Sequence, residues 1–221
     1  MSADTVPDKT SLSYLVREPK NKSGTPPLLV LLHGVGSNEG DLFSLAEFIP
    51  DKFLVVSARA PITLGPSRFA WYQVDFSTGK PVFNEEQEKT SRGIILDFIN
   101  ELRSYHSFDV GNVYLAGFSQ GGIMSYSVAL TNPERFKGIA VMSGRLLEEI
   151  KPVITPSAYL SELRMFISHG TQDTTLPVQY ARQALTYLKS LHLNPGYKEY
   201  NEGHGINSEM RSDFVAWLSN V

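Results

Sequence analysis

The hydrophobic positions of the chain fall into two kinds of segment. Short apolar runs without polar alternation, at residues 28–32, 53–56 and 113–116, predict strands that are buried on both faces of a sheet. Longer segments with apolar residues every three or four positions predict amphipathic helices. The two kinds alternate along the chain, which is typical of an α/β fold with a mostly parallel central sheet and helices on both of its faces.

Further strands are predicted from shorter or weaker patterns. They cover residues 138–142, 165–168 and 197–200, with residues 12–16 as an antiparallel edge strand. Two connections, over residues 60–83 and 144–163, are longer than most connections in compact domains. Because long loops often carry binding residues, we expect these two to shape a site.

The clearest helix is predicted over residues 84–103. Asn84 can cap this helix, and Glu85 and Glu86 suit the positive end of its dipole. Its apolar stripe consists of Ile94, Ile95, Phe98, Ile99 and Leu102. Other helices are predicted over residues 40–48, 120–131, 178–191 and 208–219.

Length and composition narrow the class of protein. The chain has 221 residues, so residues 1–221 are expected to form one domain, with no separate lid domain. Its 42% hydrophobic and 19% charged residues match a soluble globular protein. The net charge is -3 and there is no run of Lys and Arg, so nucleic acid is not an expected partner.

Two absences from the sequence limit the chemistry and the location. Without cysteine there can be no disulfide, thiolate metal site, nucleophilic thiol or palmitoyl anchor, so a nucleophile must be oxygen or nitrogen. Residues 1–8 lack the basic and apolar regions of a secretory signal, and no apolar run is long enough to span a bilayer. We therefore expect a cytoplasmic location without stable membrane anchoring, while cleavage from a longer precursor stays open.

A candidate nucleophile lies in the segment Gly117-Phe118-Ser119-Gln120-Gly121. This Gly-x-Ser-x-Gly motif follows a predicted strand and precedes a predicted helix, which is the context of a serine on a tight strand-to-helix turn. The glycines let the chains pass closely, and the start of the helix directs N–H groups and its positive dipole end at an oxyanion. The motif also occurs by chance in ordinary turns, so the interpretation depends on the context.

The chain contains partners for this serine in the order that α/β hydrolases use. A serine hydroxyl needs a histidine base, the base needs a carboxylate, and the three follow in the order Ser, Asp or Glu, His. Asp173 follows the strand predicted at residues 165–168, and His204 lies between glycines after the last predicted strand. A loop aspartate that satisfies local N–H groups and a surface turn histidine are the alternatives. We predict that Ser119, Asp173 and His204 form a catalytic triad.

Two backbone N–H groups are predicted to form an oxyanion hole. The N–H of Gln120, at the start of the helix, is the first donor. Residues 33–36 end the first central strand with glycines that let the backbone approach a substrate carbonyl. The second donor is assigned to Val35 in this segment.

The remaining histidines receive no catalytic role. His33 and His169 each precede a glycine after a strand, and a base at either position would break the expected chain order. We expect both to hold their loops by packing and hydrogen bonding. His106 and His192 lie near the ends of helical patterns and are expected to be solvated or helix-end residues.

Five segments taken together are much more specific than the serine motif alone. They are residues 32–36, residues 70–72, residues 117–122, residues 169–173 with Pro177, and residues 203–205. On these segments the chain resembles, over nearly its whole length, the phospholipase/carboxylesterase family of the α/β-hydrolase superfamily, which includes acyl-protein thioesterases. The resemblance implies the same triad and oxyanion donors and no metal or organic cofactor. One departure is Gln73, where many members carry an acidic residue, and it concerns the pocket rather than the catalytic groups.

The connection over residues 60–83 is rich in large apolar side chains. Those predicted to line an apolar acyl slot are Leu64, Phe69, Trp71, Tyr72 and Phe76. Phe83 is instead expected to pack beneath the loop. Since neither long connection is large enough for a lid domain, we expect an open site that takes short to medium acyl chains.

The predicted function is that of a serine carboxylesterase that acts on a small-molecule ester through an acyl-enzyme on Ser119. The shared motifs do not separate this activity from that of an acyl-protein thioesterase or a lysophospholipase. A third hypothesis is a hydrolase-fold binding protein without catalysis, which the intact Ser119, Asp173 and His204 oppose. A homodimer is left open, because the sequence does not locate an exposed apolar patch.

Overall fold

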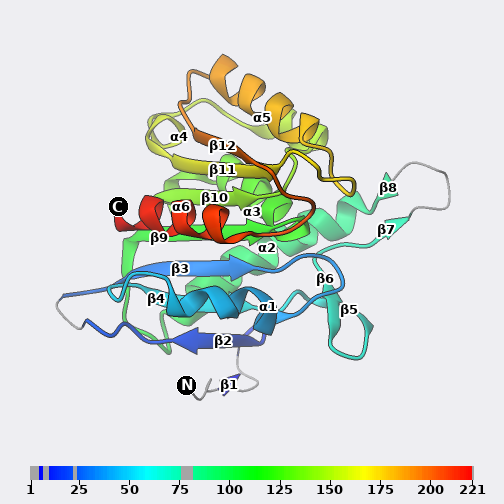
Figure 1. Cartoon of the computed structure of the whole chain (residues 1–221). Helices are drawn as coiled ribbons and strands as arrows, with labels where there is room; N and C mark the ends of the chain where they lie inside the picture. Colours follow the sequence, from blue (N-terminus) through cyan, green and yellow to red (C-terminus); the bar gives the residue numbers. More distant parts are fainter. Residues whose placement is uncertain (1–4, 7–9, 22–23, 76–81, 221) are drawn as a thin grey trace.

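The protein has a central sheet with helices on both faces (Figure 1). The computed structural model describes residues 5–6, 10–21, 24–75 and 82–220. The sheet has eight strands in the order β1-β2-β4-β3-β9-β10-β11-β12. Their bounds are β1 (Thr5–Val6), β2 (Tyr14–Arg17), β3 (Pro27–Leu32), β4 (Leu54–Ala58), β9 (Asp109–Phe118), β10 (Gly138–Met142), β11 (Arg164–Gly170) and β12 (Gly196–Tyr200). The β1-β2 and β2-β4 pairings are antiparallel and the others are parallel, which confirms the mostly parallel sheet.

Helices cover both faces of this sheet, as predicted. The α-helices are α1 (Glu39–Phe43), α2 (Glu85–Leu102), α3 (Gln120–Thr131), α4 (Ala158–Glu162), α5 (Gln179–Ser190) and α6 (Ser208–Ser219). Short 3₁₀ helices are η1 (Ser44–Glu47), η2 (Pro133–Arg135) and η3 (Glu148–Val153). Side chains of α1 and α6 pack into one core, and those of α2, α3 and α5 pack into the core on the opposite face (Figure 1). Among the described residues, no helix is both long and apolar enough to cross a membrane.

The unbroken apolar run in β3 is explained by these two cores. Leu28, Val30 and Leu32 pack into the core that contains α2 and α3, whereas Leu29 and Leu31 pack into the other core. Successive side chains of a strand point to opposite faces, so a strand covered on both faces must be apolar at every position.

The prediction for α2 is confirmed in detail. The Asn84 side chain accepts a hydrogen bond from the Gln87 N–H at 3.0 Å and so caps the helix. Ile95, Phe98 and Leu102 from the predicted stripe are fully buried. Helix α2 therefore packs along the sheet as its sequence pattern indicates.

Two elements differ from the sequence prediction. The strand expected at residues 12–16 is β2, shifted toward Arg17, and it is not the edge of the sheet because β1 pairs outside it. The helix expected at residues 40–48 changes from α1 to the 3₁₀ helix η1 at Ser44. The Ser44 hydroxyl donates to the Asp41 carbonyl oxygen at 2.8 Å, and this local bond competes with regular helical pairing.

Both long connections contain short elements of their own. The described residues of the 60–83 connection contain two antiparallel pairs, made of β5 (Ile62–Gly65) with β6 (Arg68–Ala70) and β7 (Val74–Asp75) with β8 (Val82–Phe83). Residues 144–163 contain η3 and α4. Figure 1 shows the β5–β8 region beyond the arrowhead of β3, where the carboxyl ends of the parallel strands lie. In α/β sheets this is the edge that holds ligands.

The turn from β9 into α3 allows a test of the fold, because it has no room for a side chain at Gly121. A Cβ atom there would lie 1.8 Å from the Leu32 carbonyl oxygen. We expect Gly121→Ala to lower the free energy of unfolding by about 3 kcal/mol or more, since backbone would have to move. Gly93 is the control, because it lies exposed inside α2 with nothing within 4 Å of an added Cβ.

Gly93→Ala should raise the free energy of unfolding by about 0.5–1 kcal/mol, through better helix propensity and a stiffer unfolded chain. Urea unfolding followed by circular dichroism measures both variants. Equal and small effects of the two substitutions would contradict the close packing at Gly121.

Candidate active site

Ser119 occupies the tight strand-to-helix turn that its motif predicts. It lies between β9 and α3 with φ 54° and ψ -118°, a combination that residues with a side chain rarely adopt. Its N–H donates to the Met142 carbonyl oxygen at 2.9 Å, which ties the turn to β10. A Cβ on Gly117 would lie 2.1 Å from the Gly121 carbonyl oxygen, so the two glycines of the motif face one another.

Ser119, His204 and Asp173 form one chain of hydrogen bonds. The Ser119 Oγ lies 2.9 Å from the His204 Nε2, and the His204 Nδ1 lies 2.6 Å from the Asp173 Oδ2. A carboxylate only accepts, so the Nδ1 carries the proton and the Nε2 is free to accept from the hydroxyl. The structure thus brings together the three side chains that the sequence assigns to the triad, from the ends of β9, β11 and β12.

Backbone donors surround the other oxygen of Asp173. Its Oδ1 accepts from the N–H of Thr175 at 2.9 Å and from the N–H of Leu176 at 2.8 Å. The Asp173 carboxylate is fully buried, and these bonds replace the water that it has lost. The carboxylate is therefore held in one orientation toward His204.

His169 supports the loop that carries this aspartate. Its Nε2 lies 2.6 Å from the Leu176 carbonyl oxygen and 3.3 Å from the Asp173 Oδ2, both of which only accept, so the Nε2 carries a proton. Its buried Nδ1 has no partner among the described residues, and burial lowers the pKa of His169. These contacts are those of a neutral histidine that holds its loop, the role predicted for it.

His33 supports the opposite loop in a similar way. Its Nδ1 donates to the Gly34 carbonyl oxygen at 2.7 Å, and its Nε2 accepts from the Ala60 N–H at 3.0 Å. The indole N–H of Trp71 donates to the His33 carbonyl oxygen at 2.9 Å. Burial lowers the pKa of His33, so this ring is also neutral.

The other two histidines lie away from the candidate triad. His106 lies just beyond the end of α2, as expected, and it is held there because its Nε2 lies 2.9 Å from the Tyr14 hydroxyl and its Nδ1 lies 2.9 Å from the Glu18 carboxylate. This histidine is close in space to β2, a contact that its position near a helix end does not indicate. His192 follows α5 with a φ of 62°.

The segment with the predicted oxyanion donor Val35 lies against the nucleophile. A Cβ on Gly34 would be 3.4 Å from the Ser119 Cβ. The segment is also held to β6, because the Gly36 N–H donates to the Phe69 carbonyl oxygen and the Phe69 N–H donates to the Ser37 carbonyl oxygen, each at 2.8 Å. Gly34, which precedes Val35, therefore lies against Ser119, and Gln120 follows Ser119 at the start of α3, where the N–H groups of the first turn have no acceptor within the helix.

The side chain of Gln120 is held by the segment predicted to line an acyl slot. Its Oε1 accepts from the Trp71 N–H at 2.9 Å, and its Nε2 donates to the Tyr72 carbonyl oxygen at 2.7 Å. The Trp71 and Tyr72 side chains are 0% and 1% exposed, so they pack in the core and leave no surface for a substrate. It is the backbone of these two residues that holds Gln120.

The other predicted lining residues have different surroundings. Leu64 is 40% exposed, and Phe69 is half-buried with the Arg59 guanidinium 4.7 Å from its ring centre. Phe76 lies outside the described residues. Phe83 packs against Tyr72, with 5.4 Å between the ring centres, as expected for a side chain beneath the loop.

A cavity beside His204 was not found by sequence reasoning. Its volume is about 330 Å³, and it is lined by Asp41, Leu42, Ser44, Leu45, Phe118, His204, Gly205, Ile206 and Arg211. Phe118 and Ile206 adjoin the serine and histidine motifs in the sequence. This proximity is the one sequence feature that could have indicated that they line the cavity. Within the described residues there is no group of three or more His, Cys, Asp or Glu side chains arranged to hold a metal ion.

The backbone strain at Ser119 can be measured as stability. We expect Ser119→Gly to have a free energy of unfolding about 1 kcal/mol higher than Ser119→Ala, because only glycine adopts this φ and ψ without strain. Both substitutions remove the same hydroxyl, so their difference isolates the backbone. Urea unfolding of the two variants is the measurement, and a less stable glycine variant would contradict the strain.

The buried neutral histidines predict how stability depends on pH. The pKa values of both histidines are lowered in the folded state. In the unfolded state a histidine has a pKa of about 6.5, so as the pH falls below that value the unfolded state binds more protons than the folded state. The free energy of unfolding should fall from pH 7 to pH 5 by up to about 1.4 kcal/mol per pH unit for each of His33 and His169. His33→Gln should reduce this dependence on pH by the contribution of one histidine. A free energy of unfolding that does not change between pH 7 and pH 5 in the wild type would contradict the prediction.

Comparisons with known proteins agree with this architecture. The chain is 27% identical over 208 residues to acyl-protein thioesterase 1 of Kluyveromyces lactis, covering 87% of this chain and 90% of the relative. It is 28% identical to a probable SOBER1-like carboxylesterase of Arabidopsis thaliana, covering 86% and 77%. The crystal structure of a carboxylesterase from Mesorhizobium loti superposes with a TM-score of 0.83 at 20% identity, covering 99% of each chain. The phospholipase/carboxylesterase family model matches residues 15–220, so the chain belongs to this family of α/β hydrolases that act on carboxylic esters.

Proposed function

We propose that the chain hydrolyses small-molecule carboxylic esters with short to medium acyl chains through an acyl-enzyme on Ser119. The observation that carries this proposal is the hydrogen-bonded chain from the Ser119 Oγ through His204 to Asp173, with distances of 2.9 Å and 2.6 Å. Both contacts are as short as proton transfer and orientation of the base require.

The protonation states of Ser119, His204 and Asp173 determine how acylation proceeds. His204 takes the hydroxyl proton as Ser119 attacks the ester carbonyl, and Asp173 stabilises the imidazolium that forms. The N–H groups of Val35 and Gln120 bind the oxyanion of the tetrahedral intermediate. His204 then protonates the departing alcohol, which leaves the acyl group on Ser119.

Deacylation repeats the same steps with water as the nucleophile. His204 removes a proton from the water, and the oxyanion forms again next to Val35 and Gln120. Collapse of this intermediate releases the acid and returns the proton to Ser119. The side chains that hold the site, such as His33 and His169, stay neutral and take no part in proton transfer.

The preference for short to medium acyl chains is supported by the space at the site. The cavity beside His204 has a volume of about 330 Å³, and its walls combine the apolar side chains of Leu42, Leu45, Phe118 and Ile206 with the polar side chains of Asp41, Ser44 and Arg211. A pocket of this size is at the small end of those that enclose small ligands. It suits a compact acyl group better than a long lipid chain.

Acyl-protein thioesterase activity is the second candidate. It is supported by the relative from Kluyveromyces lactis, which carries that name and matches most of the chain. The same triad and oxyanion donors serve a thioester, because only the leaving group changes. Comparing kcat/KM for an ester and a thioester of the same acyl group separates the two candidates.

Hydrolysis of 4-nitrophenyl esters from acetate to palmitate tests the proposal. We expect activity that is highest on short to medium chains and that falls by about three orders of magnitude or more in Ser119→Ala, because the triad acts as a unit. Asp173→Asn should also lose most of the activity, since the amide no longer fixes the tautomer of His204.

Ser212→Ala is the control, because this serine lies exposed on α6 and its hydroxyl bonds only within the helix. It should retain the wild-type rate. Activity that survives Ser119→Ala would exclude this nucleophile. A folded wild type that hydrolyses neither esters nor thioesters and resists a fluorophosphonate probe would favour a binding role.

A further inference from the structure

Within the described part of the chain, Arg145 is a cation without a counterion, and it lies at the carboxyl edge of the sheet. It follows the end of β10 by three residues, and among the described residues it forms no ion pair and no hydrogen bond through its side chain. Its Nε is buried and has no partner within this part of the chain. A guanidinium is always charged, and a buried N–H without an acceptor costs free energy. Contacts within the described residues therefore leave the buried Nε–H of Arg145 without an acceptor.

Aromatic rings are the neighbours of this guanidinium. Its Cζ lies 5.5 Å from the ring centre of Tyr180 and 6.0 Å from that of Phe83. Cation–π contacts of this kind orient the guanidinium and exclude water from its faces. They do not satisfy its N–H groups, which lie in the plane and are fitted to the two oxygens of a carboxylate or phosphate.

Two series of contacts connect Arg145 with residues that adjoin the nucleophile. On one side, Met142 accepts the Ser119 N–H, and a Cβ on Gly122 would be 3.4 Å from the Gly144 Cα, so the chain entering Arg145 packs on the start of α3. On the other side, its neighbour Phe83 contacts Tyr72, whose carbonyl oxygen holds the Gln120 side chain. The guanidinium is thus linked through Phe83 and Tyr72 to the residue that is proposed as an oxyanion donor.

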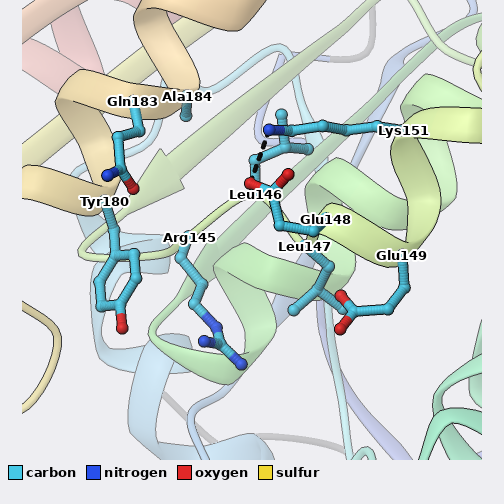
Figure 2. A pocket seen from close by; sticks show the side chains of 9 residues that line it. All are labelled: Arg145, Leu146, Leu147, Glu148, Glu149, Lys151, Tyr180, Gln183 and Ala184. Atoms are coloured by element: carbon cyan, nitrogen blue, oxygen red, sulfur yellow. Dashed lines mark hydrogen bonds and ion pairs between the residues drawn. The ribbon is translucent and has the colours of Figure 1, made fainter.

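A cavity of about 190 Å³ lies beside this side chain. Figure 2 shows Arg145 extending away from Glu148 and Lys151, which pair with each other at 2.6 Å. Glu149 also lines the cavity, but its carboxylate is not within ion-pair distance of Arg145. The acidic side chains nearby therefore leave the positive charge of Arg145 available.

We propose that Arg145 binds a negatively charged oxygen group, such as a carboxylate, on the substrate. The preferred substrates are then esters or thioesters that carry an anionic group, and this inference rests on the proposed function. An anion placed against Arg145 gains charge-assisted hydrogen bonds in a partly dry setting, and it satisfies the buried Nε. A side chain that only stacks between rings would give no such preference.

Matched pairs of esters test this proposal on each side of the scissile bond. For the acyl side the pair is 4-nitrophenyl hydrogen adipate and 4-nitrophenyl hexanoate, and for the alcohol side it is 4-acetoxybenzoate and its methyl ester. We expect kcat/KM to favour the charged member of at least one pair. Arg145→Met should reduce that ratio about tenfold, as expected for the loss of one charge-assisted contact, and Arg145→Lys should restore part of it.

Arg68→Met is the matched control for a general effect of charge. Arg68 is exposed at the same edge, with its Nη2 3.5 Å from the position of a Cβ on Gly36, and it has no ion pair among the described residues. Its removal should leave the ratio as it is in the wild type. Equal reductions in both variants, or no reduction in Arg145→Met for either pair, would overturn the proposal.

Direct binding separates this inference from the proposed function. We expect Ser119→Ala to bind monomethyl adipate in calorimetry, and Ser119→Ala with Arg145→Met to bind it about tenfold more weakly. Equal dissociation constants would overturn the role of Arg145 whether or not the chain hydrolyses esters. Hydrolysis of the neutral esters that survives Ser119→Ala would instead refute the proposed function alone.

Discussion

The close approach of three backbone segments at the β9–α3 turn is the constraint on which the site depends. Gly121 lies so near the end of β3 that a Cβ would overlap the Leu32 carbonyl oxygen, and Gly117 faces Gly121 in the same way. This approach forces Ser119 into a conformation with positive φ and raises its hydroxyl above the sheet. It also brings Gly34 against the nucleophile, so one packing requirement positions both the serine and the loop of Val35.

Side chains that have no part in the proposed chemistry hold this arrangement in place. His33 ties its loop to the Ala60 N–H, His169 ties the aspartate loop to the Leu176 carbonyl oxygen, and Gln120 bonds the backbone of the segment after β6. All three are buried, where an unmade hydrogen bond is costly. The loops of the site are therefore held by polar contacts inside the protein, and their geometry is formed before a substrate binds.

Sequence reasoning anticipates the structure where the signal lies in neighbouring residues. Ser119, Asp173 and His204 are each recognisable from the residues beside them and from their order, and the buried strands are visible as apolar runs. It fails where the surroundings of a side chain depend on the conformation of an irregular loop. Trp71 and Tyr72 are correctly seen as large and apolar, but an irregular loop has no period to show that both turn into the core. The cavity beside His204 joins three segments that are distant in sequence, so no local pattern encodes it.

The two bonds of the Gln120 side chain have a mechanical consequence. They link the backbone of the connection over residues 60–83 to the residue whose N–H is proposed to face the oxyanion. Because both bonds are buried and shielded from competing water, a displacement of the backbone at residues 71–72 is expected to be passed on to Gln120. Residues 71–72 and the start of α3 therefore behave as one mechanical unit, so a change in the backbone of this connection alters the surroundings of Ser119 from a distance.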